Sequence, residues 1–145
     1  MVESKQNISF KTIALADDDS DDTDLFGEAI LGIDPKITLE IASNGRELLN
    51  KMRSGEFALP DVIFLDINMP EMNGWQCLEA LKKDNLLKPV PVVIYSTSSH
   101  VQDKKLATAL GASLFITKPD DFQQLKQTLA RLINDPGTFM SSTNS

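Results

Sequence analysis

The stretch Val62-Ile63-Phe64-Leu65-Asp66 places a carboxylate directly after four apolar residues. A short apolar run containing β-branched and aromatic residues is typical of a strand that is covered on both faces. A carboxylate at its end must face an opening or be neutralised, because an isolated buried charge is costly. This stretch therefore predicts both a central strand of a parallel sheet and a reactive strand end.

The rest of the chain repeats this pattern, with short apolar runs alternating with longer amphipathic segments. The spacing predicts strands over residues 12–16, 37–42, 62–65, 92–95 and 114–117. It predicts helices over residues 21–31, 46–54, 75–83, 101–110 and 122–133, and Gly55 and Gly111 are suited to left-handed helix ends. Strict alternation of strands and helices implies right-handed crossovers and a three-layer α/β sandwich.

Length and charge limit the class of protein. The chain has 145 residues, with 21 acidic and 14 basic side chains and a formal net charge of −7. This length fits one domain, which we place at residues 10–134, between an N-terminal tail at 1–9 and a flexible C-terminal tail at 135–145, with no output domain. The acidic balance disfavours nonspecific binding to nucleic acid.

Cysteine content and the amino terminus indicate the compartment. The single cysteine, Cys77, excludes an internal disulfide and a multi-cysteine metal site, which favours a reducing environment. The amino terminus has no apolar run that would serve as a signal peptide, and no segment is long enough to span a bilayer. We therefore expect a cytoplasmic protein with no membrane partner.

Reactive side chains follow four of the five predicted strands. Asp17 and Asp18 come after the first strand, Asp66 after the third, Ser96 after the fourth and Lys118 after the fifth. Open α/β sheets bind ligands at the carboxyl ends of their strands. If these strands are neighbours, three carboxylates, a hydroxyl and an ammonium converge on one edge of the sheet.

Aspartates are concentrated between residues 17 and 24. Carboxylates at the start of a helix cap free amides and complement the helix dipole, which accounts for Asp19, Asp21 and Asp22. Asp17 and Asp18 precede the helix, so capping explains them poorly. Beside Asp66 they would repel one another unless a cation lay among them, and Mg²⁺ suits such a set of oxygen ligands.

The side chains around Asp66 indicate phosphoryl chemistry. A carboxylate that attacks phosphorus forms an aspartyl phosphate, and a metal ion neutralises charge on the phosphoryl oxygens during transfer. Lys118 would supply a second cation, and Ser96 would donate a hydrogen bond to a phosphoryl oxygen. Taken alone, Ser96 fits a turn hydroxyl and Lys118 a solvated lysine equally well, so their assignment depends on convergence with Asp66.

The sequence resembles the receiver domain of two-component response regulators, represented by single-domain chemotaxis regulators. The likeness rests on residues 15–19, 64–74, 92–97, 111–112 and 115–119, including Leu-Asp-x-x-Met-Pro-x-Met-x-Gly from Leu65 to Gly74. It implies a flavodoxin-like, doubly wound sheet of five parallel strands in the order 2-1-3-4-5. A weaker likeness, in residues 17–22 and 96–98, is to small regulators paired with phytochrome-type kinases.

The resemblance also implies roles for individual residues. Asp66 would be the phosphoacceptor, loaded from a histidine kinase or a phosphotransfer protein. Mg²⁺ would be bound by Asp18, Asp66 and the backbone carbonyl of Asn68, with Asp17 acting through water. The remaining implied features are Ser96 as switch hydroxyl, Lys118 as phosphoryl contact, Phe115 as switch aromatic and a cis peptide at Lys118-Pro119.

The favoured function is therefore a signalling switch, with phosphorylation at Asp66 altering protein–protein interactions. The downstream target would bind the face made by the fourth helix, fifth strand and fifth helix. Such a protein accepts and hydrolyses only its own phosphoryl group and is not an enzyme for other substrates. The alternative is an aspartate-nucleophile phosphohydrolase acting on external substrates. Those enzymes usually carry a second acid two residues after the nucleophile, where this chain has Asn68.

Overall fold

The computed structural model describes residues 10–135 and 137 of the chain, so most of both predicted tails lies outside the described residues. Five parallel strands form one sheet in the order β2-β1-β3-β4-β5. The strands are β1 (Thr12–Ala16), β2 (Thr38–Ala42), β3 (Val62–Leu65), β4 (Val92–Ser96) and β5 (Leu114–Thr117). The helices are α1 (Ser20–Ile33), α2 (Gly45–Ser54), α3 (Gly74–Lys83), α4 (Val101–Ala109) and α5 (Phe122–Asn134). The predicted doubly wound fold and strand order are confirmed.

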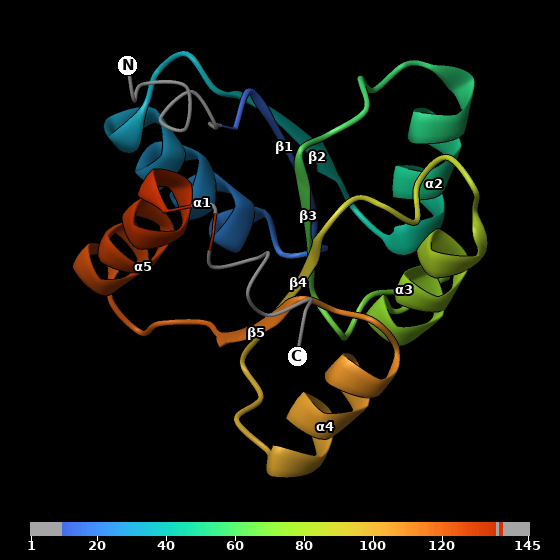
Figure 1. Ribbon diagram of the computed structural model, residues 1–145. Helices are drawn as coiled ribbons and strands as arrows, with labels where there is room; N and C mark the ends of the chain where they lie inside the picture. Colours follow the sequence, from blue (N-terminus) through green and yellow to red (C-terminus); the bar gives the residue numbers. More distant parts are fainter. Residues whose placement is uncertain (1–9, 136, 138–145) are drawn as a thin grey trace.

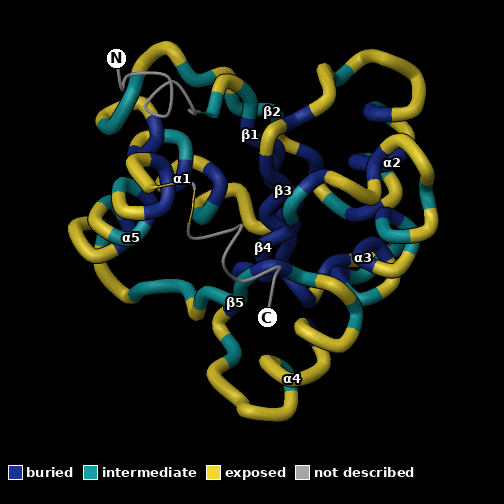
Figure 2. The backbone as a smooth tube through the Cα atoms, viewed as in Figure 1, coloured by how far each residue is buried: buried dark blue, intermediate teal, exposed yellow. Residues whose placement is uncertain are grey.

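The helices cover both faces of the sheet, and the sheet divides the core into two layers. Figure 1 shows α1 and α5 on one side of the sheet and α2 and α3 on the other, with α4 beyond β5. Along β1 the side chains alternate, so Ile13 and Leu15 pack toward α1 and α5 while Ala14 and Ala16 pack toward α2 and α3. Strands β3 and β4 are buried along their whole length and β1 is buried after Thr12 (Figure 2), as their apolar runs predicted.

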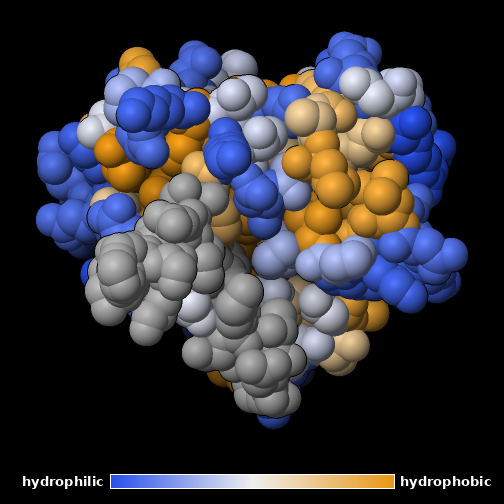
Figure 3. Space-filling model, turned by 45° about the horizontal axis from the view of Figure 1, so that its top comes forward, coloured by the Kyte–Doolittle hydropathy of each residue, from blue (hydrophilic) through white to orange (hydrophobic). Residues whose placement is uncertain are grey.

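The outer surface is more polar. Figure 3 shows hydrophilic side chains over much of the face that it views, with an apolar area on the side of α2 and α3. Leu59 and Leu86, in the loops before β3 and β4, are more than half exposed. In the part of the chain that the structure describes, no helix has the length and apolar character needed to cross a membrane.

Side-chain caps mark the start of every helix except α4. Asp19 accepts hydrogen bonds from the backbone N–H groups of Asp21 and Asp22, as its predicted capping role requires. Asn44 and Asn73 cap α2 and α3, and Asp121 caps α5. Each cap satisfies N–H groups that the first turn of a helix leaves without partners. Gly55 and Gly111 have the predicted left-handed backbone, with φ values of 85° and 102°.

The Lys118-Pro119 peptide differs from the expectation. No peptide bond among residues 10–135 is cis, so the cis form implied by the family resemblance is wrong here. The trans form is intrinsically favoured for a bond preceding proline. The Lys118 N–H donates to the Ser96 carbonyl at 2.7 Å, so the end of β5 is already aligned with β4 with this bond trans.

Gly74 allows the start of α3 to approach the loop that follows Asp66. The Gly74 N–H donates to the Ile67 carbonyl at 2.9 Å. A Cβ atom at Gly74 would overlap the Asp66 carbonyl oxygen and lie 2.9 Å from Ile67 Cα. Because both obstacles are backbone atoms, no side-chain rotation relieves the overlap. This contact therefore fixes the backbone immediately after Asp66.

We expect Gly74→Ala to lower the free energy of unfolding by about 2 kcal/mol or more, because the backbone after Asp66 must move. Gly27→Ala, within α1, is the matched control. A Cβ atom there meets only Leu39 Cδ2 at 3.6 Å, and alanine favours a helix by about 0.8–1 kcal/mol over glycine. Urea unfolding followed by circular dichroism measures both variants. Equal stability of Gly74→Ala and the native chain would contradict the proposed constraint.

Candidate functional site

Three carboxylates meet at the carboxyl ends of β1 and β3. Asp17 and Asp18 follow β1, Asp66 follows β3, and these two strands are paired neighbours in the sheet. One carboxylate oxygen from each of the three lies within 4.8 Å of the others. The backbone N–H groups of Asp17 and Asp66 extend the sheet, donating to Ala42 and Ala16 at 3.0 Å. The sheet itself thus holds two of the three acids, and the predicted convergence of the three carboxylates is confirmed.

The Lys118 ammonium completes this charged group. Its Nζ atom lies 2.8 Å from Asp17 Oδ2 and 3.4 Å from Asp66 Oδ2, and the side chain is only 9% exposed. Burial alone would lower the Lys118 pKa, but hydrogen bonds to Asp17 and Asp22 outweigh burial and raise the pKa. The ammonium therefore remains charged at neutral pH, at the end of the strand where the sequence predicted it.

Asp22 also belongs to this site, although its position in the sequence predicts only a role at the start of α1. Its Oδ2 atom accepts a hydrogen bond from Lys118 Nζ at 2.7 Å. The expectation that Asp22 serves only capping and the helix dipole is wrong, because its carboxylate pairs with Lys118. The first turn of α1 follows β1 directly and brings Asp22 to the sheet edge where Lys118 ends. The position of Asp22 in the first turn of α1 is the feature of the sequence that could have indicated its place at this site.

The surroundings of the Asp66 carboxylate disfavour its charged form. Asp66 is 8% exposed, and its Oδ1 atom accepts a hydrogen bond from the Ile67 N–H at 2.8 Å. Burial raises the pKa of Asp66 to about 6, with Lys118 opposing the rise and Asp17 adding to it. Above that pH, the ammonium contacts the carboxylates of Asp17, Asp22 and Asp66, and the Asp18 carboxylate lies close to those of Asp17 and Asp66. The site therefore carries excess negative charge.

An aromatic cluster supports the ammonium from the core side. Lys118 Nζ lies 5.3 Å from the centroid of the Tyr95 ring, within the range of a cation–π contact. Tyr95 packs edge to face with Phe26 and Phe64 at centroid distances of 5.5 and 6.2 Å. Burial raises the Tyr95 pKa to about 12, so the phenol stays neutral. This cluster connects the site to the core beneath α1 and α5.

Ser96 lies at the edge of the same site and connects to α4 through hydrogen bonds. Ser96 is 1% exposed, and its Oγ atom accepts a hydrogen bond from the Ser98 N–H at 3.2 Å. Ser98 Oγ in turn donates to Asp103 Oδ2 at 2.6 Å, in the first turn of α4. Thr117 Oγ1 donates to the Ser98 carbonyl at 2.9 Å. A movement of the Ser96 hydroxyl would therefore disturb contacts to both α4 and β5.

The other residues selected from the sequence have less direct connections to the site. Phe115 is half-buried and packs against the core layer beneath α2 and α3. Asn68 is exposed in the loop after β3, and His100 is exposed before α4. Cys77 is fully buried, and burial raises its pKa to about 12.

The donor set of the site fits a divalent cation. Asp17, Asp18 and Asp66 offer only carboxylate oxygens, which are the ligands that hard cations prefer. The excess of carboxylates over ammonium groups favours cation binding, because a divalent cation offsets the repulsion among them. Asp17 Oδ1 also accepts a hydrogen bond from the Asp19 N–H at 3.0 Å, which helps to hold that carboxylate in place.

Comparison with known proteins identifies the family. Residues 13–130 match the family model described as the response regulator receiver domain, so the chain belongs to that family. Protein PilH of Pseudomonas aeruginosa is 34% identical over 100 residues, covering 65% of this chain and 83% of PilH. A protein-glutamate methylesterase/protein-glutamine glutaminase of Archaeoglobus fulgidus is 39% identical over 122 residues. That match covers 78% of this chain but 33% of the relative.

Solved structures agree with this assignment. The phosphorylated cyanobacterial phytochrome response regulator RcpA superposes with a TM-score of 0.80 at 29% identity, covering 86% of this chain and 92% of RcpA. The Mn²⁺-bound form of response regulator Rcp1 gives a TM-score of 0.76 at 25% identity, covering 84% and 91% of the two chains. The protein is thus a receiver domain of two-component signalling, and the resemblance found in the sequence is confirmed.

The raised Asp66 pKa predicts a pH-dependent effect of Asp66→Asn on stability. A carboxyl whose pKa is higher in the folded state makes the fold lose stability as pH rises between the unfolded and folded values, here 3.8 and about 6. Asparagine does not ionise. We therefore expect Asp66→Asn to stabilise the metal-free chain by about 1–2 kcal/mol at about pH 8 and much less at about pH 4.5.

Chemical unfolding in the presence of a chelator measures this difference. Asp24→Asn is the control, because it removes an exposed carboxylate from α1 in the same acidic stretch. A stability gain of equal size at both pH values, or a loss at the higher pH, would show that the ionised Asp66 carboxylate does not destabilise the fold.

Proposed function

We propose that this receiver domain is a Mg²⁺-dependent phosphoacceptor and that Asp66 is the residue phosphorylated. The observation that carries the proposal is the gathering of Asp17, Asp18 and Lys118 around a buried carboxylate at the end of β3. With a pKa of about 6, Asp66 is ionised at neutral pH and is a competent nucleophile. The phosphoryl donor is a histidine kinase or a phosphotransfer protein.

Each charged residue has a defined part in this reaction. An Asp66 oxygen forms a bond to phosphorus as the bond from phosphorus to the donor nitrogen breaks. Lys118 offers its ammonium to the phosphoryl oxygens from a starting distance of 3.4 Å to Asp66 Oδ2. Asp18, Asp66 and the Asn68 backbone carbonyl would bind Mg²⁺, with Asp17 acting through water. The ion, when bound, supplies charge neutralisation for the transferring group.

The switch is a shift between two populated conformations. The phosphoryl group on Asp66 attracts the Ser96 hydroxyl, which then gives up its hydrogen bond from the Ser98 N–H. Because Ser98 also bonds Asp103 and Thr117, this loss changes how α4 meets β5. Phe115 turns inward to fill the space that Ser96 vacates. Since Phe115 has no hydroxyl, burial alone drives its movement.

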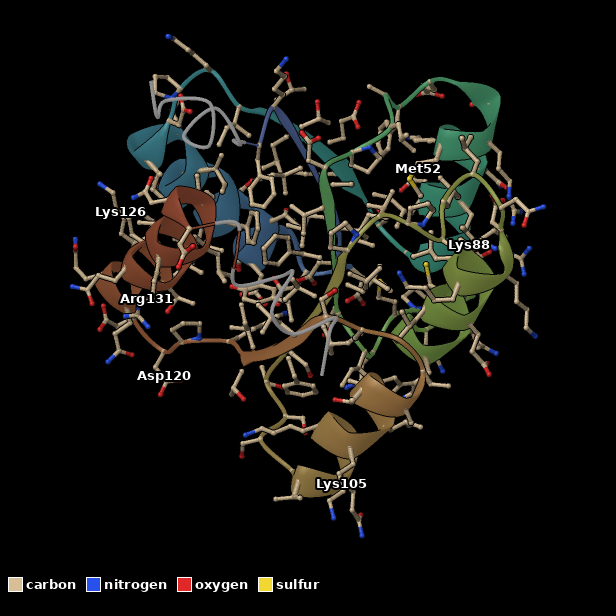
Figure 4. The ribbon with its side chains drawn as sticks, viewed as in Figure 1. Met52, Lys88, Lys105, Asp120, Lys126 and Arg131 are labelled. Atoms are coloured by element: carbon tan, nitrogen blue, oxygen red, sulfur yellow. The ribbon has the colours of Figure 1, made fainter. Side chains whose placement is uncertain are left out.

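The surface proposed to bind the downstream target is the face made by α4, β5 and α5. Val101 and Leu106 of α4 are 63% and 41% exposed, so this helix presents apolar side chains to solvent. Lys105 extends from α4 away from the body of the molecule (Figure 4). A short helix held by few core residues is suited to movement, because little burial opposes it.

The cellular location and the phosphoryl donor follow from the same assignment. A cytoplasmic location is expected, since histidine kinases deliver their phosphoryl groups there. RcpA is a phytochrome response regulator, which makes a phytochrome-type kinase the first donor to test. An external phosphohydrolase is less consistent with the site, because the residue two positions after Asp66 is Asn68 rather than an acid. Phosphoryl transfer is therefore stoichiometric, and hydrolysis is confined to the domain's own acyl phosphate.

Incubation with a small acyl phosphate tests the acceptor without knowledge of the kinase. We expect intact-mass spectrometry to find one added phosphoryl group in the native chain with Mg²⁺, and none with a chelator. Asp66→Asn should remain unmodified, because an amide is not a nucleophile toward phosphorus. Asp24→Asn, an exposed α1 variant, should behave as the native chain. Retained modification of Asp66→Asn would contradict the assignment.

The switch is tested by NMR with beryllofluoride, which imitates a phosphoryl group on a carboxylate. With Mg²⁺ present, we expect backbone amide shifts to change from Ser96 through Leu110, because the Ser96 hydroxyl leaves Ser98. Ser96→Ala should retain the changes beside Asp66 and lose most of those in α4. Changes confined to the loop after β3 in the native chain would contradict the proposed connection to α4.

A further inference from the structure

Lys118 is bonded more closely to Asp22 than to the proposed phosphoacceptor. An ammonium has three N–H bonds to donate. Two of them serve Asp17 and Asp22, at 2.8 and 2.7 Å, whereas Asp66 Oδ2 is 3.4 Å away. Charge-assisted hydrogen bonds are strongest at the two shorter distances. In this state the lysine's two strongest bonds are therefore made to residues other than Asp66.

The partners of Lys118 differ in how readily each can be replaced. The Asp17 side chain is fully buried at the end of β1, and the Tyr95 ring lies against the ammonium from the core. The Asp22 side chain, in contrast, is 33% exposed, and it belongs to the first turn of α1 rather than to the sheet. Water can reach Asp22 and take the place of the ammonium there. The bond to Asp22 is thus the easiest of the short bonds for Lys118 to give up.

We propose that Asp22 is a positioning residue that competes with the incoming phosphoryl group for the Lys118 ammonium. This inference rests on the proposed phosphoacceptor function of Asp66. When the phosphoryl group arrives, its oxygens accept the N–H that Lys118 had donated to Asp22, and water solvates the released carboxylate. Asp22 thereby binds Lys118 before phosphorylation and stabilises the unphosphorylated state.

The proposal makes opposite predictions for the two ligands of the site. Removal of the Asp22 charge releases Lys118 and decreases repulsion, so a phosphoryl-like anion should bind more tightly. The same change makes the site less negative, so a divalent cation should bind more weakly. A role in folding alone would weaken both ligands together. The difference in sign therefore separates competition for Lys118 from structural damage.

Asp22→Asn is the informative variant, because asparagine keeps the shape of the side chain and removes its charge. Asp21→Asn is the matched control, since Asp21 lies in the same turn of α1 and is exposed. Isothermal calorimetry measures Mg²⁺ affinity, and then beryllofluoride affinity at saturating Mg²⁺. We expect Asp22→Asn to tighten beryllofluoride binding about threefold to tenfold and weaken Mg²⁺ binding about twofold to threefold. Asp21→Asn should change either affinity by less than about twofold.

A double-mutant cycle with Lys118→Gln tests whether the lysine carries the effect. If Asp22 acts through Lys118, the Asp22→Asn gain in beryllofluoride affinity should largely disappear in the Lys118→Gln background. A gain that persists there would overturn the competition and leave charge repulsion as the cause. Unchanged or weaker beryllofluoride binding by Asp22→Asn would also overturn it. Failure of the native chain to bind either ligand would instead contradict the proposed function of Asp66.

Discussion

Placing a carboxylate at the buried end of an apolar strand creates the electrostatic problem around which this site is organised. Asp66 follows four buried residues of β3, and burial raises its pKa to about 6. The ionised form is tolerated because Lys118 approaches it from β5, the strand on the other side of β4. Asp17 limits that relief, since it stands beside Asp66 and takes one of the lysine's shorter bonds. A divalent cation bound by these carboxylates would relieve the remaining repulsion, which links the fold to its proposed ligand.

The surroundings of the site hold this charge distribution in place. Gly74 lets α3 start against the backbone of Asp66 and Ile67, and the sheet fixes the backbone of Asp17 and Asp66. Tyr95 joins the lysine to the aromatic core, where Phe26 and Phe64 lie 5.0 Å apart between ring centroids. By contrast, the connection from Ser96 toward α4 consists of hydrogen bonds in a loop. The backbone around Asp66 is therefore held more firmly than the hydrogen-bonded loop that connects Ser96 to α4.

The sequence predicted the fold well because its strongest signals are local. Buried strands appear in the sequence as apolar runs, and the capping residue Asp19 marks the start of α1. Asp17, Asp18, Asp66 and Lys118 could be grouped because parallel strands end at one edge. Asp22 was missed because its role depends on how the first turn of α1 meets a lysine that follows it by 96 residues. The contacts of Tyr95 and the trans Lys118 peptide likewise arise from tertiary packing, which local patterns do not encode.

The central claim is that Asp66 is the residue that captures phosphorus, and chemical trapping tests it most directly. Borohydride reduces an aspartyl phosphate to homoserine, and peptide mass spectrometry then identifies the position of the converted residue. After treatment of the native chain with Mg²⁺ and an acyl phosphate, the account predicts homoserine at position 66 and nowhere else among the aspartates. Conversion at Asp17, Asp18 or Asp22, with position 66 unchanged, would contradict it.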